Sequence, residues 1–413
     1  MFKLPHDILL PDNFILNTIA GISYIRKPEE KSKLQYLHYL EDKVKTLPTV
    51  YEEFDTCYVY LTFSLKCNLS CVYCFQHTAK LNDYLMSEDE IYNQYCTIIN
   101  KLKNNYSKIE VILYGGEPLL LKNYSLVEKM LLYLENEKIP LRIITNGVLL
   151  NVYIDMLRKY PYLQEITITI DGSKDIHDSR RKLSNGKGTY NIIIDNLILA
   201  LNHLSTSITI RVNLDQQNIS MQDEFISSMI SIQNESKSKL SICYYRTTNK
   251  TNSYNDKYLL NIATFSKFMD QIIYKYGNNI KIKSGDNVYN QMKDILENDY
   301  LIYPRLTYCE YGYIYVLGAN GHIYTCSETI GDSQFELCSY SDNNTINQLT
   351  HNTKNSTIFD IKTPCSLCPV NTICGGGCIL SKKSGGKYCE REEIIEALKN
   401  MYLSRKNNSY HSI

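Results

Sequence analysis

The sequence has 413 residues but no tryptophan, no net charge and no long hydrophobic run. Its 44 Lys and Arg residues balance 44 Asp and Glu residues, which argues against a generally basic nucleic-acid-binding protein. No run of about 18 apolar residues is present, so no transmembrane helix is expected. The first residues, MFKLPHDILLPDN, lack a charged segment followed by an apolar one, and no secretory signal is expected. These absences predict a cytoplasmic protein that binds neither nucleic acid nor membrane.

Cysteine is the residue type that carries information. Fourteen cysteines in 413 residues are too few for a disulfide scaffold. A cytoplasmic chain keeps its thiols reduced, and clustered thiols there more often bind metal or take part in catalysis. The length is typical of two or three domains.

Six short runs rich in β-branched and aromatic residues recur in the first two thirds of the chain, and each is expected to form a buried strand. They are Tyr58–Lys66, Glu110–Tyr114, Leu141–Thr145, Glu165–Ile170, Ile208–Leu214 and Leu240–Arg246. Helical patterns lie between them, at Ser125–Glu137, Asn151–Lys159, Tyr190–Leu204 and Ser227–Gln233. This alternation predicts an α/β fold with a parallel sheet. About 190 residues suit a partial barrel of six units, with its chemistry at the C-terminal strand ends.

The rest of the chain divides around this barrel. The expected parts are an N-terminal extension (1–56), the barrel (57–250), a bridge (251–304), a cysteine-rich domain (305–395) and a C-terminal helix end with a tail (396–413). The extension holds a possible hairpin at Phe14–Ile25 and a charged helix at Pro28–Lys45. One helix is expected in the bridge, at Phe265–Tyr276, and another begins at Arg391 and runs to Leu403.

Three cysteines follow the first expected strand with the spacing C-x3-C-x2-C: Cys67, Cys71 and Cys74. Thiolates are the usual ligands of iron–sulfur clusters. A cubane with three cysteine ligands keeps one iron open, and an open metal position is typical of a catalytic centre. Zinc is the alternative, with His77 as its fourth ligand.

With Tyr73 inside it, this motif resembles the signature of the radical SAM superfamily, whose fold is a partial (β/α)6 barrel. The resemblance implies that S-adenosylmethionine binds the open iron of a [4Fe–4S] cluster. One electron, from a donor such as flavodoxin or ferredoxin, then cleaves it to methionine and a 5′-deoxyadenosyl radical. The protein would orient the cofactor and exclude side reactions.

Further residues of a cofactor site follow from the resemblance. Gly115-Gly116-Glu117-Pro118 matches the family's GGEP motif, which meets the methionine amino group; glycine allows close backbone approach and a carboxylate suits an ammonium. Asp171-Gly172 and the following HDSRR segment resemble a DG…HDxxR motif that selects Arg181 rather than Arg180. Residues at three strand ends are expected to contact the ribose or the methionine carboxylate. They are Asn146, Thr169 and Asn213.

Seven further cysteines crowd the C-terminal region as Cys309-x11-Gly321-x4-Cys326, then Cys365-x2-Cys368-x5-Cys374-x3-Cys378-x10-Cys389. Two zinc sites would suit such pairs. The spacing is also similar to the SPASM domain of one radical SAM subgroup, which holds two auxiliary [4Fe–4S] clusters. That resemblance implies that the distal cluster is bound by Cys365, Cys368, Cys374 and Cys389. It gives the nearer cluster Cys309, Cys326 and Cys378, with a hairpin at Tyr311–Tyr324 joining the first two.

One cysteine of the full SPASM set, a few residues before Cys309, is missing here. The nearer cluster is therefore expected to have an open iron or to use Cys338. The remaining thiols, Cys57, Cys96 and Cys243, are expected in the core, although Cys243 could face the barrel interior.

The SPASM subgroup mostly modifies peptides and proteins, and two reactions compete. One is a maturase of ribosomally made precursor peptides that installs a thioether or carbon–carbon crosslink. The other is a sulfatase-maturating enzyme, in which an aspartate base directly follows the cysteine equivalent to Cys326. Here Ser327 and then Glu328 follow, which weakens the second interpretation and makes Glu328 the candidate proton acceptor. Residues 1–56 could bind a leader peptide by β-augmentation or could cap the barrel. A non-catalytic metal-binding protein remains the distant alternative.

Overall fold

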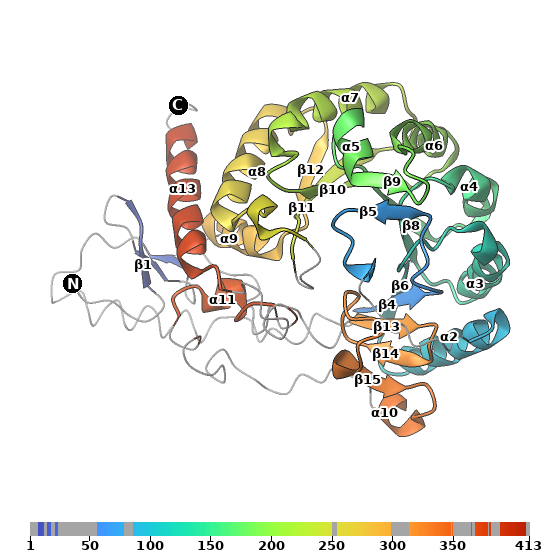
Figure 1. Cartoon of the computed structure of the whole chain (residues 1–413). Helices are drawn as coiled ribbons and strands as arrows, with labels where there is room; N and C mark the ends of the chain where they lie inside the picture. The colour runs from blue at the N-terminus through green and yellow to red at the C-terminus, as the bar shows by residue number, and fades with distance from the viewer. Residues whose placement is uncertain are drawn as a thin grey trace.

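The computed structural model describes residues 7–11, 15–17, 21–23, 56–77, 86–249, 254–298, 314–347, 349, 365, 368–378, 380 and 389–409. Among these residues, one large sheet has the strand order β12-β11-β10-β8-β7-β6-β4-β13-β14-β15 and curves into an open barrel (Figure 1). Its strands are β4 (Thr56–Thr62), β6 (Lys108–Leu113), β7 (Leu141–Thr145), β8 (Leu163–Thr169), β10 (Ser207–Leu214), β11 (Leu240–Arg246), β12 (Lys281–Ser284), β13 (Ile314–Gly318), β14 (His322–Tyr324) and β15 (Glu336–Ser339).

The six expected barrel strands are confirmed as β4, β6, β7, β8, β10 and β11, and each pairs in parallel with its neighbours. The first was expected to continue to Lys66, but β4 ends at Thr62. Its parallel partners end there too, at the pairs Leu61↔Leu113 and Thr62↔Gly318. Because no neighbour continues, the apolar residues that follow leave the sheet.

The sheet extends beyond the six expected strands at both edges. On one side, β12 pairs in parallel with β11. The segment 251–304, expected as a bridge, therefore contributes to the barrel through α8 (Ile262–Tyr276), β12 and α9 (Asn287–Asn298). The sequence signal of β12 is weak because its four residues, KIKS, include a single apolar side chain. On the other side, β13 pairs in parallel with β4.

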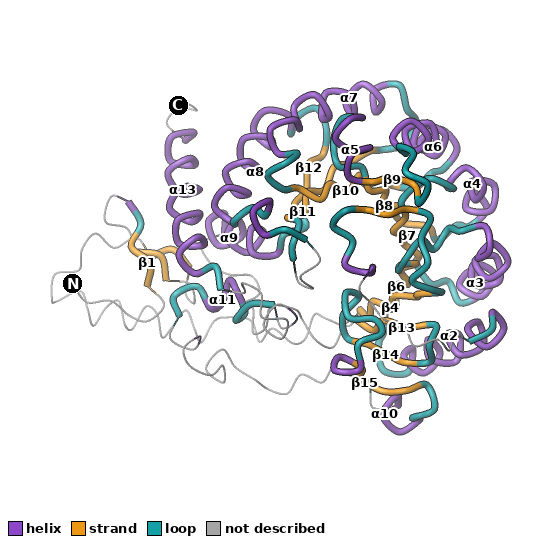
Figure 2. The backbone as a smooth tube through the Cα atoms, viewed as in Figure 1, coloured by secondary structure: helices purple, strands orange, loops and turns teal. Residues whose placement is uncertain are grey.

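Helices cover the outer face of the barrel (Figure 2). The expected helices are confirmed as α3 (Tyr124–Asn136), α4 (Leu150–Lys159), α6 (Tyr190–His203), α7 (Gln222–Asn234), α8 and α13 (Arg391–Ser409). Two further helices, α2 (Glu88–Lys103) and α5 (Lys174–Arg180), were not expected. The start of α2 is a capping box, in which Ser87 and Glu90 satisfy each other's backbone N–H groups.

Successive side chains of β10 alternate between the apolar core under the helices and the interior of the barrel. Ile208, Ile210 and Val212 are fully buried in the apolar core. Arg211 and Asn213 point the opposite way, since successive side chains of a strand face opposite sides of the sheet. The strands therefore place polar side chains inside the barrel and apolar ones under the helices.

The smaller parts of the chain partly match expectation. A three-stranded antiparallel sheet of β1 (Asp7–Leu9), β2 (Ile15–Asn17) and β3 (Gly21–Ser23) confirms the hairpin within Phe14–Ile25. The helix expected at Pro28–Lys45 lies outside the described residues. The hairpin β13–β14 is confirmed and turns at Gly318–Gly321. Within the part of the chain that the structure describes, no helix is long and apolar enough to cross a membrane.

Short elements complete the C-terminal part and the cysteine loop. They are α10 (Asn343–Asn347), α11 (Asn371–Cys374), β5 (Leu69–Cys71) and β9 (Arg181–Leu183). Helix α13 lies along α8 (Figure 1). The two-stranded sheet of β5 and β9 is antiparallel and stands at the C-terminal end of the barrel strands.

Candidate functional site

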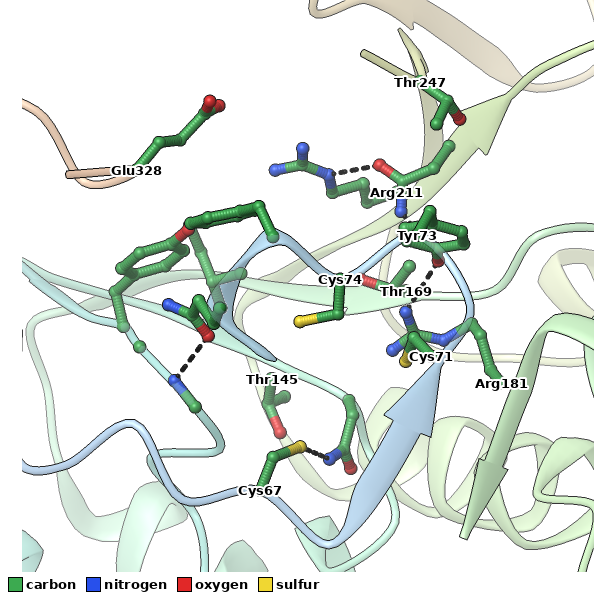
Figure 3. A pocket seen from close by; sticks show the side chains of 18 of the residues that line it. Cys67, Cys71, Tyr73, Cys74, Thr145, Thr169, Arg181, Arg211, Thr247 and Glu328 are labelled. Atoms are coloured by element: carbon green, nitrogen blue, oxygen red, sulfur yellow. Dashed lines mark hydrogen bonds between the residues drawn. The ribbon is translucent and has the colours of Figure 1, made fainter. Parts of the chain in front are cut away.

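A cavity opens at the C-terminal edge of the parallel strands, where the fold class predicts chemistry. The thiols of Cys67, Cys71 and Cys74 line it (Figure 3). It is also lined by six of the other residues expected at a cofactor site: Tyr73, Gly115, Gly116, Asn146, Thr169 and Asn213. Arg181 lines it as well, but His77, the fourth ligand of the zinc alternative, does not.

The cysteine loop is held by the small sheet of β5 and β9. Cys71 is paired with Arg181 across this sheet, although the two residues are far apart in sequence. The backbone N–H of Val72 donates to the carbonyl of Arg180 at 3.0 Å, which extends the pairing by one residue. The chain then turns, and the N–H of Cys74 donates to the carbonyl of Cys71 at 3.1 Å. This pairing fixes the thiol of Cys71 beside the guanidinium of Arg181.

The glycine pair packs directly against the start of the cysteine loop. Gly115 and Gly116 have φ angles of +89° and +53°, a region that side chains other than glycine rarely occupy. A Cβ atom on Gly116 would lie 2.3 Å from the carbonyl oxygen of Lys66. The N–H of Gly116 donates to Oε1 of Gln76 at 2.9 Å. Glycine is therefore required here for close backbone approach, as the motif predicted.

Glu117 does not line the cavity as expected. Its carboxylate accepts hydrogen bonds from the N–H of Leu119 (2.9 Å), from Oγ1 of Thr145 (2.6 Å) and from the N–H of Asn146 (2.6 Å). Burial raises the pKa of this carboxyl, while these three donors oppose the rise. In this geometry Glu117 holds the end of β7 in place. Pro118 is likewise buried outside the cavity, and its carbonyl accepts from Nδ2 of Asn123 at 2.9 Å.

The hydroxyl of Tyr73 joins three elements at the cavity wall. It donates to Oδ2 of Asp171 at 2.6 Å and accepts from Nη1 of Arg181 at 2.8 Å and Nδ2 of Asn213 at 3.0 Å. Asp171, expected as a cofactor contact, is fully buried behind this wall and does not line the cavity. Burial favours a higher pKa for Asp171, but Arg180 and Arg181 outweigh it and lower the pKa. Asp171 thus acts as an ionised anchor for Tyr73.

The two neighbouring arginines have different surroundings. Arg180 donates from Nε to Asp171 at 3.1 Å and from Nη1 to Asp215 at 2.6 Å, and its guanidinium lies 4.9 Å from the centre of the Tyr73 ring. Arg181 instead lines the cavity. Of the pair, only Arg181 can therefore meet a cofactor, which agrees with the choice made from the HDSRR segment. The sequence did not indicate the buried role of Arg180.

The chemistry of the thiols fits a metal cluster. Cys67 Sγ accepts from the N–H of Leu69 at 3.4 Å and from Nδ2 of Asn146 at 3.7 Å. Burial raises the pKa of Cys71 to about 11, against the opposing effect of Arg181. Metal binding supplies the positive charge that ionises such thiols. Within the described residues, no three His, Cys, Asp or Glu side chains are arranged to hold a single metal ion. Three thiols around a cavity are the donor set that iron–sulfur clusters use.

The opposite side of the cavity carries charged residues from later parts of the chain. Glu328, the candidate proton acceptor, lines it from the loop after β14, and its N–H donates to Sγ of Cys326 at 3.5 Å. Arg211 and Arg246 also line it and were missed. Strand alternation could have found Arg211, which precedes Asn213 by two residues and shares its face.

Four C-terminal thiols lie close together. Burial raises the pKa of Cys368, and the nearby thiols of Cys365 and Cys389 raise it further. In the same way Cys368 and Cys389 help burial to raise the pKa of Cys374 to about 11. These four residues are the set expected for the distal cluster.

The other cysteines are placed as follows. Cys309 lies outside the described residues. Cys338, the expected substitute ligand, is buried on β15 in the apolar core, where burial raises its pKa to about 11. Cys57 is fully buried and Cys96 is half-buried, as expected of core residues. Cys243 is buried on β11, on the same side of the sheet as Tyr245.

Residues 61–228 match the family model of the radical SAM superfamily. The radical SAM cyclopropyl synthase TigE of Paramaledivibacter caminithermalis is 32% identical over 171 residues, which cover 34% of this chain and 35% of that protein. This chain thus spans about a third of the length of that curated relative.

Two solved structures share the fold. Native anSMEcpe with bound AdoMet and Cp18Cys peptide superposes with a TM-score of 0.64 and 18% identity, over 86% of this chain and 99% of that one. Streptococcus suis SuiB bound to precursor peptide SuiA gives a TM-score of 0.62 and 16% identity, over 91% of this chain and 84% of that one. Residues 61–228, the central part of the barrel, therefore match the radical SAM superfamily, and the two solved structures show the same fold.

Proposed function

Because residues 61–228 match the radical SAM superfamily, we propose that this protein modifies a ribosomally made peptide by hydrogen abstraction and installs a thioether or carbon–carbon crosslink or a related modification. One observation carries the proposal. A single cavity brings together the three thiols of the cysteine loop, Arg181 of the HDSRR segment, and Glu328 from beyond the barrel. The proposed cofactor-binding residues thus lie on one wall of the cavity, and Glu328, a candidate substrate-facing residue, lies on another.

The residues of the cavity have distinct proposed roles. Cys67, Cys71 and Cys74 would hold a [4Fe–4S] cluster to which S-adenosylmethionine would bind. When bound, these groups supply the abstraction of a hydrogen atom from an unactivated carbon. Arg181 binds the methionine carboxylate in an orientation that Tyr73 holds.

Asn146, Thr169 and Asn213 line the cavity at the ends of β7, β8 and β10, where they offer polar groups to the ribose. Because Gly115 and Gly116 have no Cβ atom, their backbone carbonyl oxygens are proposed to accept hydrogen bonds from the methionine amino group. Asp171, Glu117 and Pro118 support this wall from behind.

A peptide is the substrate that the similar structures favour, since SuiB was solved with a precursor peptide and anSMEcpe with the Cp18Cys peptide. The sheet of β1, β2 and β3 is proposed as a reduced leader-binding module. The SPASM cysteines are proposed to hold two auxiliary clusters, which would supply an acceptor for an electron. A flavodoxin or ferredoxin is proposed as the external electron donor.

Glu328 is proposed as the group that accepts a proton from the substrate during the modification, because its side chain lines the cavity. Formylglycine formation, as in sulfatase-maturating enzymes, stays the alternative reaction. In that family the base directly follows the cysteine, whereas here Ser327 separates Cys326 from Glu328.

The central claim is tested with anaerobically purified protein. Three clusters require roughly 12 iron and 12 sulfide per chain. Replacing Cys67, Cys71 and Cys74 together with alanine should remove a third of the iron and abolish formation of 5′-deoxyadenosine. Cys96→Ala is the matched control, because this thiol lies on α2 away from the cavity. Zinc without iron–sulfur absorbance would instead support a metal-binding protein.

The substrate is tested by co-expression with each short open reading frame beside the gene. A crosslink removes two hydrogen atoms from the peptide, and fragmentation then locates the new bond. A formylglycine product would be identified by its reaction with hydrazide reagents, and would overturn the crosslink in favour of the alternative.

A further inference from the structure

Arg211 presents hydrogen-bond donors to the cavity that the cofactor motifs do not explain. Its Nε donates to Oδ1 of Asn213 at 3.1 Å. Among the described residues, no acceptor lies within hydrogen-bond or ion-pair distance of its two terminal nitrogens. Figure 3 shows the guanidinium extending from β10 into the cavity, on the side where Glu328 enters.

The guanidinium is held in one orientation. It stacks on the ring of Tyr245, with 4.0 Å between its central carbon and the ring centre. The ring in turn requires Gly285, since a Cβ atom there would lie 2.1 Å from two ring carbons of Tyr245. A planar, pre-oriented fork of donors loses little entropy when it binds an acceptor.

An acceptor stands near this donor. The carboxylate of Glu328 lines the same cavity. Burial lowers the pKa of Arg211, but Tyr245, Tyr114 and the nearby Glu328 outweigh this effect and raise it. A carboxylate has about four acceptor positions, so it keeps some for a substrate even when other groups bind it. The cavity therefore holds a cationic donor and an anionic acceptor on one side.

We propose that Arg211 and Glu328 bind the backbone of the peptide substrate, with Arg211 donating to the carbonyl and Glu328 accepting from the N–H of one extended residue. In an extended chain, the N–H and C=O of one residue point to the same side, as they do in an antiparallel pair. This inference rests on the proposed function and adds that recognition near the reacting carbon is independent of side-chain identity.

A substrate carboxylate fits this pair less well. It would match the fork of Arg211 but would meet the like charge of Glu328, and neighbouring like charges disfavour binding. A peptide group is neutral and satisfies both partners, so it leaves neither charge buried without a hydrogen bond.

The test measures binding to the cluster-containing protein with S-adenosylmethionine and without reductant, so that no turnover occurs. The probe is N-acetyl-tetraalanine-N′-methylamide, with a series of analogues in which an ester oxygen replaces each N–H in turn. Saturation-transfer NMR gives the dissociation constants. We expect one ester analogue to bind about tenfold more weakly than the amide, because a hydrogen bond to a charged group is lost.

Two variants separate the two contacts. Arg211→Met should weaken binding of the amide probe about tenfold, and Arg211→Lys should recover only part, because lysine lacks the planar fork. In Glu328→Ala, the amide and every ester analogue should bind equally. Arg158→Met, an exposed arginine on α4 that pairs with Asp155, is the matched control and should bind like the wild type. Circular dichroism establishes that each variant is folded.

Three outcomes would overturn the inference: equal binding of all ester analogues to the wild type, wild-type affinity in Arg211→Met, or displacement of the probe by acetate at similar concentration. The last would identify a carboxylate site. These failures are distinguishable from failure of the proposed function, which depends on iron content and on 5′-deoxyadenosine formation by the cysteine loop.

Discussion

Nδ2 of Asn213 donates a hydrogen bond to the hydroxyl of Tyr73 over 3.0 Å. The bond joins β10 to the cysteine loop, two segments separated by 140 positions. Since Oδ1 of the same amide accepts from Arg211, the amide cannot rotate without losing both bonds. One side chain thus ties the cofactor wall to the opposite wall, and several predictions depend on this connectivity.

Replacing Asn213 with leucine should weaken binding of S-adenosylmethionine. The change removes one of two donors to Tyr73, so Arg181 is held less firmly in the cavity. The loss should be about fivefold, as for a hydrogen bond worth roughly 1 kcal/mol. Equilibrium dialysis with labelled cofactor measures it. Asn202→Leu, a half-buried asparagine on α6 that does not line the cavity, should leave the affinity unchanged, and an equal loss in both variants would argue against this role.

Arg180→Met should destabilise the fold much more than Arg181→Met. Arg180 pairs with Asp171 and Asp215, whose side chains are both fully buried, and its removal leaves two carboxylates without their partner. Breaking a buried pair costs about 3–5 kcal/mol of unfolding free energy. Chemical denaturation of the apo protein measures the difference. If Arg181→Met were the less stable variant, the division of roles between the two arginines would be wrong.

Gly116→Ala should reduce cluster loading. The new Cβ atom would overlap the carbonyl oxygen of Lys66, and the backbone there has a positive φ. The loop must then move away from the cysteine loop, and the iron content should fall. Gly186→Ala is a matched control, because Gly186 also has a positive φ, of +84°, but nothing lies within 4 Å of its Cβ position. Similar iron contents for the two variants would contradict the packing argument.

The stability of the apo protein should fall as the pH drops from about 6.5 to about 4. Burial lowers the pKa of His177 from its ordinary value of 6.5 to about 4, and Nε2 of the ring is bonded to Oγ1 of Thr189 at 3.0 Å. Below pH 6.5 the His177 ring binds a proton in the unfolded chain but not in the folded chain. Unfolding therefore becomes more favourable as the pH falls, until the pKa of His177 in the folded protein is reached. The free energy of unfolding should fall by about 3 kcal/mol over this pH range.

The matching measurement compares denaturation midpoints of the wild type and His177→Gln across this pH range. The variant should lack this part of the pH dependence. His203→Gln, at an exposed position on α6, should keep it. A wild-type profile that stays flat over the range would refute the assignment to His177.

Arg246→Met should loosen one auxiliary cluster. The guanidinium, on the last residue of β11, donates to Asp286 at 2.6 Å and to both carboxylate oxygens of Glu390 at 2.6 and 3.0 Å. Glu390 follows Cys389 directly, so this half-buried pair ties an expected cluster ligand to the barrel. Iron analysis should show the loss of about one cluster in three. Arg391→Met, an exposed arginine also close to Cys389, should retain the iron.

Local patterns in the sequence were enough to predict the barrel and the cysteine loop. Strand and helix periodicity is a property of neighbouring residues, and C-x3-C-x2-C places its ligands within one turn of chain. The strands β4, β6, β7, β8, β10 and β11 were predicted for this reason. The strand β12 was not, because pairing with β11 rather than its own apolar content places it in the sheet.

Tertiary structure alone decided how the side chains at the site are used. The motif predicts Glu117 as a cofactor ligand, yet its carboxylate accepts hydrogen bonds from Thr145, the last residue of β7, and from Asn146, which follows it. Arg180 and Arg181 are adjacent in the sequence, and only the positions of Asp171 and Asp215 make one structural and the other accessible. Hydrogen-bond partners and burial depend on segments far apart in the chain. The sequence by itself therefore predicted three clustered thiols as metal ligands, because their spacing is local, and the fold determined which polar groups face the cavity.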